Sequence, residues 1–247
     1  MIIIPLSEGS FTIDKSKVFI PFDTTKHNLH DRNKGSLLVQ IQPFLIITKS
    51  DIILLDTGLG FANEDGVLQI HQNLLNNKIK PQAITKILLS HLHKDHSGGL
   101  SYKPRSSNAR SLSFPNASVY VSEKEYQYAF EKTIASYETE QFECLKSSSN
   151  LILLKDDKGV ITPEISYEVS GGHCPYHTTF TVVEDDVVFY GGDVAPQLQQ
   201  MKSRFVAKYD FDGKKSMELR TKWWQEGEKK HWTFLFYHDI KTPEFKR

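Results

Sequence analysis

The most informative segment of the chain is Ser90-His91-Leu92-His93-Lys94-Asp95-His96-Ser97-Gly98-Gly99. Four residues that can bind a metal ion lie within six positions here, and three of them are histidines. Imidazole binds divalent zinc, iron or manganese at neutral pH. Burying several histidines together without a metal would leave polar groups unpaired, which costs free energy. The stretch therefore predicts a metal centre.

Runs of apolar residues that favour β-strands precede this stretch and several other polar residues. Ile84 to Leu89 precedes it directly, and Ile52-Ile53-Leu54-Leu55 runs into Asp56-Thr57-Gly58. Three more runs end in the same way in the second half of the chain. Glycine pairs, which let the backbone approach a crowded site closely, precede two of their polar residues. These three predicted strand ends are Ile165–Val169 before His173, Val187–Tyr190 before Asp193, and Trp232–Tyr237 before His238.

The spacing within the histidine stretch predicts ligands for two ions. Alternating positions at a strand end place His91 and His93 on one side, whereas the adjacent Asp95 and His96 diverge. Two ions need more ligands than four. The other strand ends supply them, with His173, Asp193 and His238.

These motifs, taken in order, resemble the dinuclear hydrolases of the metallo-β-lactamase superfamily. The resemblance spans roughly residues 37 to 239, and Asp56-Thr57-Gly58 matches that superfamily's strand-end aspartate. It implies an α/β fold with four layers, an αββα sandwich of two facing sheets with helices outside, in a single domain over residues 1–247. It also implies that His91, His93 and His173 hold the first metal, that Asp95, His96 and His238 hold the second, that Asp193 bridges both, and that Asp56 orients ligands from behind.

Several assignments have alternatives. His173 and Asp193 follow Gly-Gly pairs, which are common in turns, and Asp56 could be a plain turn or cap residue. The final ligand could be His231 or Asp239 in place of His238. His177 either supports the ligands from behind or is exposed, and Cys174 reads as a small buried residue.

Composition limits the classes of function. Thirty basic residues balance thirty acidic ones among 247, which gives no support to a nucleic-acid partner. Two cysteines are too few for a disulfide framework, and the short apolar start fits neither a signal peptide nor a membrane span. We therefore expect a cytoplasmic protein that acts on a small molecule, without a membrane or nucleic-acid partner. Its oligomeric state stays open.

The remaining segments suggest helices and one long loop. Helices are expected near Val67–Asn76 and Ser216–Glu226, and Ser122 with Glu125 resembles a capping box that starts a helix running toward Tyr137. Residues 101–114 are serine-rich, with uncompensated basic side chains. They predict a loop or lid beside the histidines, or else an ordinary solvated loop.

The predicted ligand set favours hydrolysis. Two divalent ions bring four positive charges, of which Asp95, Asp193 and a bridging hydroxide remove three. The remaining positive charge lowers the pKa of the bound water toward about 7 and stabilises a developing oxyanion. Asp95 would orient the hydroxide and handle its proton. The ligands suit zinc, iron or manganese, of which we expect zinc.

Among the superfamily's branches, quorum-quenching lactonases are most similar in length and in the position of the last histidine. The resemblance therefore implies hydrolysis of a lactone or related ester, such as an acyl-homoserine lactone. A phosphodiester or phosphotriester hydrolase is one alternative, and a metal-loaded protein that binds a small ligand without turnover is another.

The sequence departs from those lactonases near the expected substrate. They carry a tyrosine three residues after the bridging aspartate, where this chain has Pro196, and their Thr-Pro-Gly-His motif has no match around His173-Cys174-Pro175-Tyr176-His177. The missing hydroxyl could come from Tyr176, Tyr209 or Tyr237, each of which could instead be a packing residue. Phe61, Trp223 and Trp224 could line an acyl pocket or lie in the core.

Overall fold

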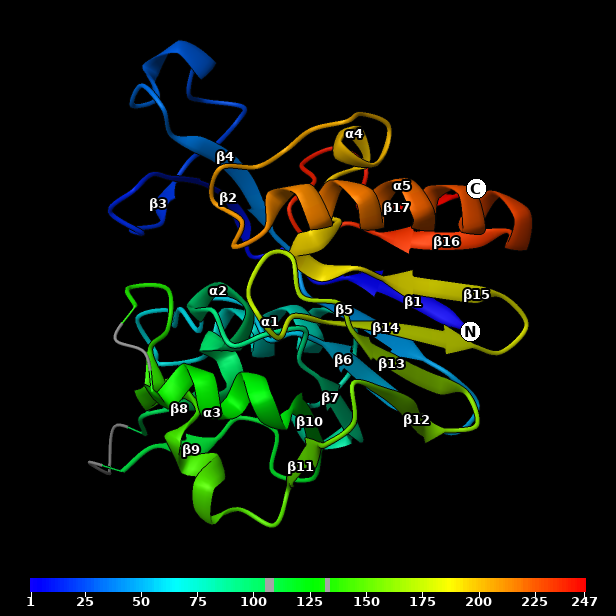
Figure 1. Cartoon of the computed structure of the whole chain (residues 1–247). Coiled ribbons are helices and arrows are strands. Elements are labelled where there is room, and N and C mark those ends of the chain that lie inside the picture. Colours follow the sequence, from blue (N-terminus) through cyan, green and yellow to red (C-terminus); the bar gives the residue numbers. More distant parts are fainter. Residues whose placement is uncertain (105–108, 132–133) are drawn as a thin grey trace.

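Two six-stranded β-sheets face each other at the centre of the molecule (Figure 1). The structure is a computed structural model and describes residues 1–104, 109–131 and 134–247. In the first sheet the pairs β6–β7, β7–β10 and β10–β11 are parallel, and the pairs with β5 are antiparallel. Its strands, in spatial order, are β1 (Ile2–Pro5), β5 (Phe44–Ile47), β6 (Ile52–Leu55), β7 (Lys86–Leu88), β10 (Ser118–Ser122) and β11 (Leu151–Leu154).

The second sheet is antiparallel except for one pair, β15–β16. Three of its strands, β13, β15 and β16, run in the same direction, so their carboxyl ends meet at one edge of the sheet. Its strands, in spatial order, are β12 (Lys158–Thr162), β13 (Ile165–Val169), β14 (Thr178–Val183), β15 (Val187–Tyr190), β16 (Trp232–Leu235) and β17 (Glu244–Lys246).

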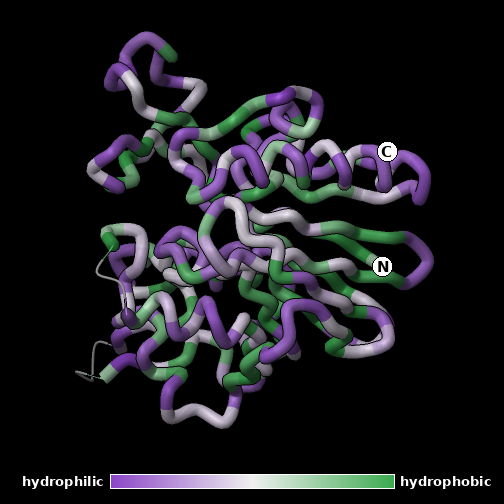
Figure 2. Tube along the Cα trace, in the orientation of Figure 1, coloured by the Kyte–Doolittle hydropathy of each residue, from purple (hydrophilic) through white to green (hydrophobic). Residues whose placement is uncertain are grey.

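Alternate side chains of the central strands enter different apolar layers. In β5, Phe44 and Ile46 pack between the two sheets, whereas Leu45 packs toward the helices outside the first sheet. In β15, Val188 lies between the sheets and Phe189 faces the outer side of the second sheet. Strands buried on both faces need continuous apolar runs, because side chains alternate between the faces. Figure 2 shows these strands as mostly hydrophobic.

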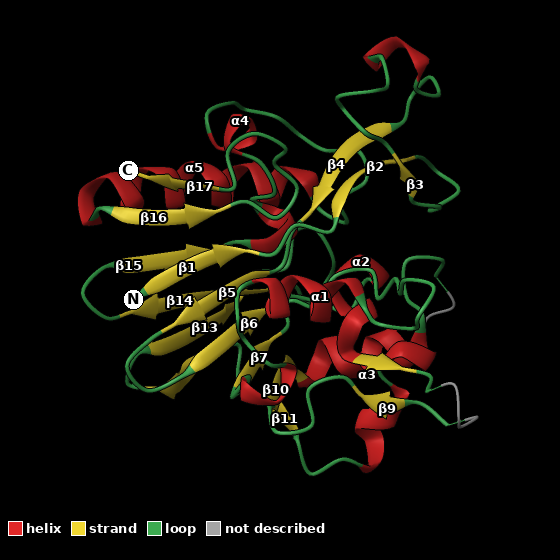
Figure 3. Cartoon of the chain, turned by 180° about the vertical axis from the view of Figure 1, so that it is seen from behind, coloured by secondary structure: helices red, strands yellow, loops and turns green. Residues whose placement is uncertain are grey.

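Helices cover the outer faces of both sheets (Figure 3). Ile70 and Leu74 of α1, with Tyr126 and Ala129 of α3, pack on the first sheet. Trp223 of α5 packs on the second. The predicted four-layer αββα sandwich is therefore confirmed. The α-helices are α1 (Gln69–Asn76), α2 (Lys94–Ser97), α3 (Glu123–Glu131), α4 (Leu198–Met201) and α5 (Gly213–Lys230).

A small three-stranded sheet forms an arm that extends beyond the sandwich (Figures 1 and 3). It contains β2 (Gly9–Ile13), β3 (Ile20–Pro21) and β4 (Leu37–Ile41), in the order β3-β2-β4. Short 3₁₀ turns η1 to η6 connect other elements, at Leu29–Asp31, Pro81–Ala83, Gly98–Leu100, Thr139–Gln141, Glu143–Ser147 and Gly192–Val194. Within the described ranges, the structure contains no helix with the length and hydrophobicity that crossing a bilayer requires.

One local prediction was wrong, and the structure adds detail to another. Glu125 does not cap α3, because its buried carboxylate accepts hydrogen bonds from the Leu92 N–H and the Tyr137 hydroxyl, both at 3.0 Å. Residues 101–114 include a short pair of strands, β8 (Ser101–Tyr102) and β9 (Ser111–Leu112). Arg110 folds back to donate to Ser101, and residues 105–108 lie outside the described part of the chain.

Candidate metal centre

Ligand-type side chains from both sheets meet at one edge of the sandwich. The first sheet contributes the segment that follows β7, whose first residues form a loop before the short helix α2. The second sheet contributes the loop after β13, the turn η6 after β15, and the segment after β16. Groups of three such residues, with ligand atoms within 4.8 Å of one another, are His91, His93 and His173; His91, His96 and Asp193; and Asp95, His96 and His238.

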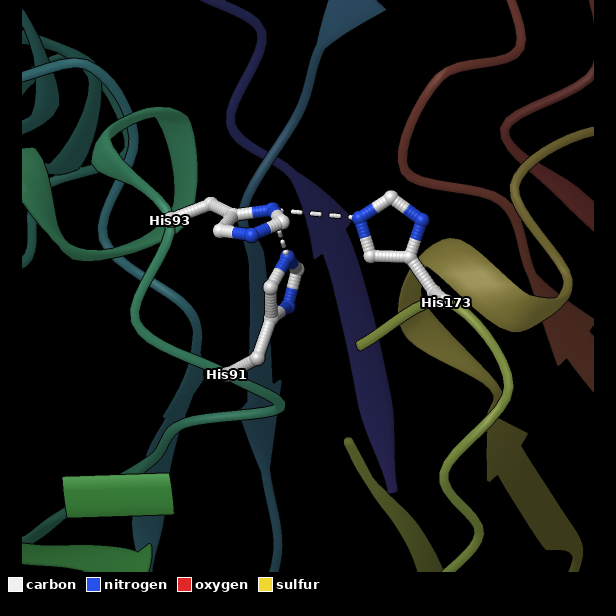
Figure 4. Close-up of side chains that lie close together, drawn as sticks. All are labelled: His91, His93 and His173. Atoms are coloured by element: carbon white, nitrogen blue, oxygen red, sulfur yellow. Dashed lines mark hydrogen bonds between the residues drawn. The ribbon is translucent and has the colours of Figure 1, made fainter. Parts of the chain in front are cut away.

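Three imidazoles form the first group (Figure 4). Nδ1 of His93 lies 3.0 Å from Nε2 of His91 and 3.1 Å from Nε2 of His173. Nitrogen ligands about 2.0–2.1 Å from a tetrahedral zinc ion lie roughly 3.4 Å from one another. The three nitrogens converge at nearly that spacing, as a shared metal ion requires.

The second group combines Asp95, His96 and His238. Oδ2 of Asp95 lies 3.7 Å from Nε2 of His96 and 3.6 Å from Nε2 of His238. Mixed imidazole and carboxylate ligands suit zinc, iron and manganese alike.

Asp193 lies between the two groups. Its Oδ1 is 3.0 Å from Nε2 of His238 and 3.1 Å from Nε2 of His96, while its Oδ2 is 3.4 Å from Nε2 of His173. One carboxylate thus reaches both groups, which is the arrangement that a bridging ligand needs.

Unpaired atoms indicate what the site is built to hold. Nε2 of His96 and Oδ1 of Asp193 are both buried and lie 3.1 Å apart, but among the described residues neither atom forms a contact with the geometry of a hydrogen bond. Buried polar atoms almost always have a partner, so these two mark a place for one. A divalent cation fits them, because it accepts lone pairs from imidazole nitrogen and carboxylate oxygen together.

The histidines of the site fall into two groups, one with lowered and one with raised pKa values. Burial and the neighbouring histidines hold the pKa values of His91 and His93 well below the usual range, so both are neutral at pH 7 and free to donate a lone pair. Burial also acts to lower the pKa of His96 and His238, but nearby carboxylates, above all Asp193, outweigh it and raise both pKa values. A metal ion would have to displace the protons from these two rings.

Groups behind the ligands fix which nitrogen each ring presents. Asp56 accepts from the Ser90 N–H and hydroxyl, both at 2.7 Å, and its Oδ2 lies 2.7 Å from Nδ1 of His96. The Tyr190 hydroxyl donates to the same carboxylate. His96 therefore directs Nε2 toward the centre. Asp56 has a left-handed backbone with φ of 56°, a conformation that tertiary contacts must hold.

Two further rings are oriented in the same manner. Nδ1 of His238 lies 2.7 Å from the carbonyl oxygen of Gln40 on β4, and Nδ1 of His173 lies 2.9 Å from Oδ1 of Asp210. Such contacts fix the tautomer of a metal-binding histidine and raise its basicity. Sequence reasoning missed Asp210, because no motif surrounds it and it lies in an irregular segment between α4 and α5.

His177 is buried and supports the centre from behind. Its Nε2 accepts a hydrogen bond from the backbone N–H of Asp193 at 3.1 Å, and its Nδ1 lies 3.0 Å from the Ser170 hydroxyl. The alternative that it is exposed was wrong.

The competing candidates for the last ligand lie elsewhere. His231 is an exposed C-terminal cap of α5 with a left-handed backbone. Asp239 accepts a hydrogen bond from the Leu198 N–H at the start of α4. Cys174 is buried, as expected, with its sulfur 3.5 Å from the Glu125 carboxylate.

A cavity of about 670 Å³ opens over the ligands. The arm and the segment before α5 form its walls, and none of the described residues of the segment 101–114 lines it. Of the two alternatives for this segment, its described residues support an ordinary loop and not a lid, because Arg110 donates to Ser101 and faces a separate depression. Apart from the ligands, the cavity is lined by Ile13, Asp14, Lys15, Lys17, Phe19, Gly35, Leu37, Leu38, Val39, Lys94, Ser136, Pro196, Gln197, Gln200, Phe205, Val206, Lys208 and Tyr209.

The aromatic residues proposed for an acyl pocket do not line this cavity. Trp223 is buried in the core between α5 and the second sheet, and Trp224 packs against the same core. Phe61 is about half exposed and faces the separate depression. The core alternative therefore holds for both tryptophans, because the helix that carries them covers the outer face of the sheet.

Only one of the three candidate tyrosines faces the cavity. The Tyr237 hydroxyl donates to the backbone carbonyl of Asp95, and its ring stacks on His96. Tyr176 packs against Tyr128, away from the cavity. Tyr209 lines the cavity, with its hydroxyl 3.4 Å from the side-chain nitrogen of Gln200.

Comparison with known families agrees with this geometry. A model of the metallo-β-lactamase superfamily matches residues 38–220, which include six of the seven convergent ligand-type residues. The chain belongs to the metallo-β-lactamase superfamily. Its His and Asp clusters have the arrangement of a metal site, as expected of a metal-dependent hydrolase of this superfamily. No curated protein sequence compared with the chain matched it.

Solved structures share this metallo-β-lactamase fold over nearly the whole chain. A probable metal-dependent hydrolase from Staphylococcus aureus is 24% identical, with a TM-score of 0.78, and the match covers 99% of this chain and 91% of that one. AidC, a dizinc quorum-quenching lactonase in complex with a product, is 20% identical, with a TM-score of 0.73 and coverage of 98% and 88%. The hydrolase AbOPH is 22% identical, with a TM-score of 0.69 and coverage of 99% and 89%.

Proposed function

We propose that this protein is a single-domain, dinuclear hydrolase that opens a lactone or a similar ester. The observation that carries the proposal is Asp193, whose carboxylate lies within 3.4 Å of ligand nitrogens from both groups. In this proposal His91, His93 and His173 hold one ion, Asp95, His96 and His238 hold the other, and Asp193 bridges them. Zinc is the expected metal, since AidC is described as a dizinc enzyme.

The ions would supply the chemistry that side chains lack at neutral pH. When bound, they would lower the pKa of a water between them toward about 7 and stabilise the oxyanion of an attacked ester. Asp95 lines the cavity, and we assign to it the orientation of that water and the acceptance of its proton. Asp56, Asp210 and His177 hold the ligands from behind.

The cavity supports a substrate with an apolar part. The cavity is lined by apolar residues of the arm and of the segment before α5, namely Ile13, Phe19, Leu38 and Val39 from the arm and Phe205 and Val206 from that segment. Two of the structural neighbours are described with N-hexanoyl homoserine as the bound product, an acyl chain joined to an opened lactone. An acyl-homoserine lactone or a related ester is therefore the substrate class that we propose.

Tyr209 is the side chain that we propose in place of the tyrosine missing at position 196. It is in the cavity wall and its ring lies 6.3 Å from that of His173. Burial raises the pKa of Tyr209 to about 12, so its hydroxyl stays protonated and can donate a hydrogen bond to the carbonyl or the leaving group.

A second candidate is phosphodiester or phosphotriester hydrolysis. The observation that favours it is the group of lysines in the cavity wall, Lys15, Lys17 and Lys208, which suit a phosphate. A rate panel separates the candidates. Purified protein loaded with zinc or manganese is assayed with lactones of several acyl lengths, with p-nitrophenyl esters and with bis(p-nitrophenyl) phosphate. Turnover of lactones above the phosphate supports our proposal, and no lactone or ester turnover with either metal rejects it.

The same assay tests a binding protein without turnover. That alternative predicts tight binding and unchanged ligand. Mass spectrometry that finds a bound lactone heavier by one water would exclude it.

A further inference from the structure

The cavity wall carries positive charge that the metal centre does not need. Lys15 and Lys17 lie on the β2–β3 connection of the arm, and Lys208 lies in the segment before α5. Apolar side chains from the same two segments line the cavity with them. The cavity therefore combines hydrophobic surface with three cations that are not metal ligands.

Lys17 is held in place by an unusual turn. Its backbone N–H donates to the carbonyl of Asp14 at 3.0 Å, and its φ is +58°, in the left-handed region that residues with a Cβ rarely adopt. The carboxylate of Asp14 accepts from the N–H of Ser16 at 2.8 Å and fixes the same turn. Residues held in such a sparsely populated backbone conformation are concentrated at functional sites.

Lys17 lies in the wall of the cavity that opens over the metal ligands, and His93, Asp95 and His173 line the same cavity. Lys17 is half-buried, whereas Lys15 and Lys208 are exposed. Among the three lysines it is therefore the one least surrounded by solvent.

Lys17 also lacks a counterion. In the described ranges it forms no ion pair, while Lys94, another lysine of the cavity, pairs with Glu138 at 3.1 Å. Asp14 is the acidic residue nearest in sequence, but its carboxylate is engaged by Ser16 and Asn33 and interacts electrostatically with Lys15. The remaining acidic residues of the cavity wall, Asp95 and Asp193, belong to the metal centre.

We infer that the substrate carries a second, anionic group on its apolar part, and that Lys17 recognises this group. The inference rests on the proposed hydrolase function and narrows its substrate class. The scissile ester lies at the ligands, the apolar chain follows the wall formed by the arm and residues 205–206, and a carboxylate or phosphate meets Lys17. Lys15 and Lys208 attract the same anionic group more weakly, because they are exposed and their charges are screened by solvent and salt.

A binding experiment tests this without requiring turnover. Zinc-loaded protein is titrated calorimetrically with hexanoate and with adipate, which has the same chain length and a second carboxylate. Both offer one carboxylate to the metal centre, and only adipate offers another to Lys17. We expect adipate to bind about tenfold more tightly than hexanoate at low salt, and the preference to shrink as salt is raised.

Variants separate the role of Lys17 from general effects. Lys17→Met should remove the preference for adipate, because it should weaken adipate binding more than hexanoate binding. Lys17→Arg should retain the preference, and Lys155→Met, a change at an exposed lysine outside the cavity, should have no effect. Metal content and melting temperature show whether each variant is folded. Equal binding of the two compounds, or an unchanged preference in Lys17→Met, overturns the inference while the proposed hydrolase stands. Failure of both compounds to bind would count against both proposals.

Discussion

The carboxylate of Asp210 lies behind the imidazole of His173, with its Oδ1 2.9 Å from Nδ1. The contact orients Nε2 of His173 toward Nδ1 of His93 at 3.1 Å. It joins an irregular segment near α5 to a ligand that follows β13. The metal centre therefore depends on a residue that is 37 positions away in sequence from His173, the ligand that it orients.

We expect Asp210→Ala to weaken metal binding by about 10- to 100-fold, because His173 would lose the group that fixes its tautomer. Competition with a chromophoric chelator measures the affinity. Asp156→Ala, at an exposed carboxylate on the far connection β11–β12, is the matched control. Equal affinities for Asp210→Ala and the control would show that the contact has no role in metal binding.

His93→Ala tests the proposed ligand set directly. Nδ1 of His93 lies within 3.1 Å of two other ligand nitrogens, so its loss should remove about one ion per chain together with most activity. Elemental analysis of the purified variant gives the ratio of metal to protein. Two ions per chain in the variant would contradict the assignment.

Metal affinity should rise with pH. Burial acts to lower the pKa of His96 and His238, but Asp193 and its neighbours outweigh it, so both pKa values are raised and both rings hold protons that a metal must displace. Below the raised pKa values, each displaced proton costs roughly a factor of ten in affinity per pH unit. Zinc titrations at pH 6, 7 and 8, repeated in buffers of different ionisation enthalpy, measure the protons released. A binding enthalpy that is the same in all buffers, together with a zinc affinity that does not change with pH, would refute this prediction.

Tyr209→Phe should lower kcat for lactones by roughly 10- to 100-fold, with little change in KM, because a hydrogen-bond donor to developing charge is removed. Tyr176→Phe is the control, since Tyr176 lies outside the cavity and packs on Tyr128. Steady-state kinetics on the best lactone from the rate panel provide the comparison. If both variants behave alike, the Tyr209 hydroxyl takes no part in turnover.

Glu8 should make stability depend on pH. Burial of its carboxyl group raises the pKa of Glu8 from 4.5 to about 8, and the charge of Asp95 adds to the shift. The folded protein then retains a proton that the unfolded chain loses, so this residue's contribution to stability falls as pH rises from about 4.5 to about 8. Glu8→Gln cannot lose that proton.

Melting curves of Glu8→Gln and the unsubstituted protein between pH 5 and 8.5 test this. The two melting temperatures should be similar at pH 5, and the variant should melt higher at pH 8.5. A difference that stays constant across the range would mean that the Glu8 carboxyl is solvated and ordinary. Comparing the two proteins at each pH cancels the other titrating groups, provided both carry the same metal content.

Local sequence pattern was enough to locate the central strands and the candidate ligands, and the resemblance to the superfamily supplied the sandwich. Strands buried on both faces must be nearly continuous apolar runs, so Ile52–Leu55 and Val187–Tyr190 were recognisable without a partner. Residues that closely follow such strands, as His91 and Asp193 do, lie at the edge of the sheet.

The surroundings of those ligands depend on the tertiary structure. Gln40 lies on a strand, but nothing in the sequence indicates that its carbonyl oxygen meets His238, and Asp210 lies in an irregular segment without a periodic pattern. Lys17 lines the cavity only because of where the arm lies. The ends of strands can be predicted from local hydrophobic pattern, because every residue of a buried strand is apolar. The walls of the cavity depend instead on contacts between loops that are distant in sequence, and such contacts leave no pattern in the local sequence.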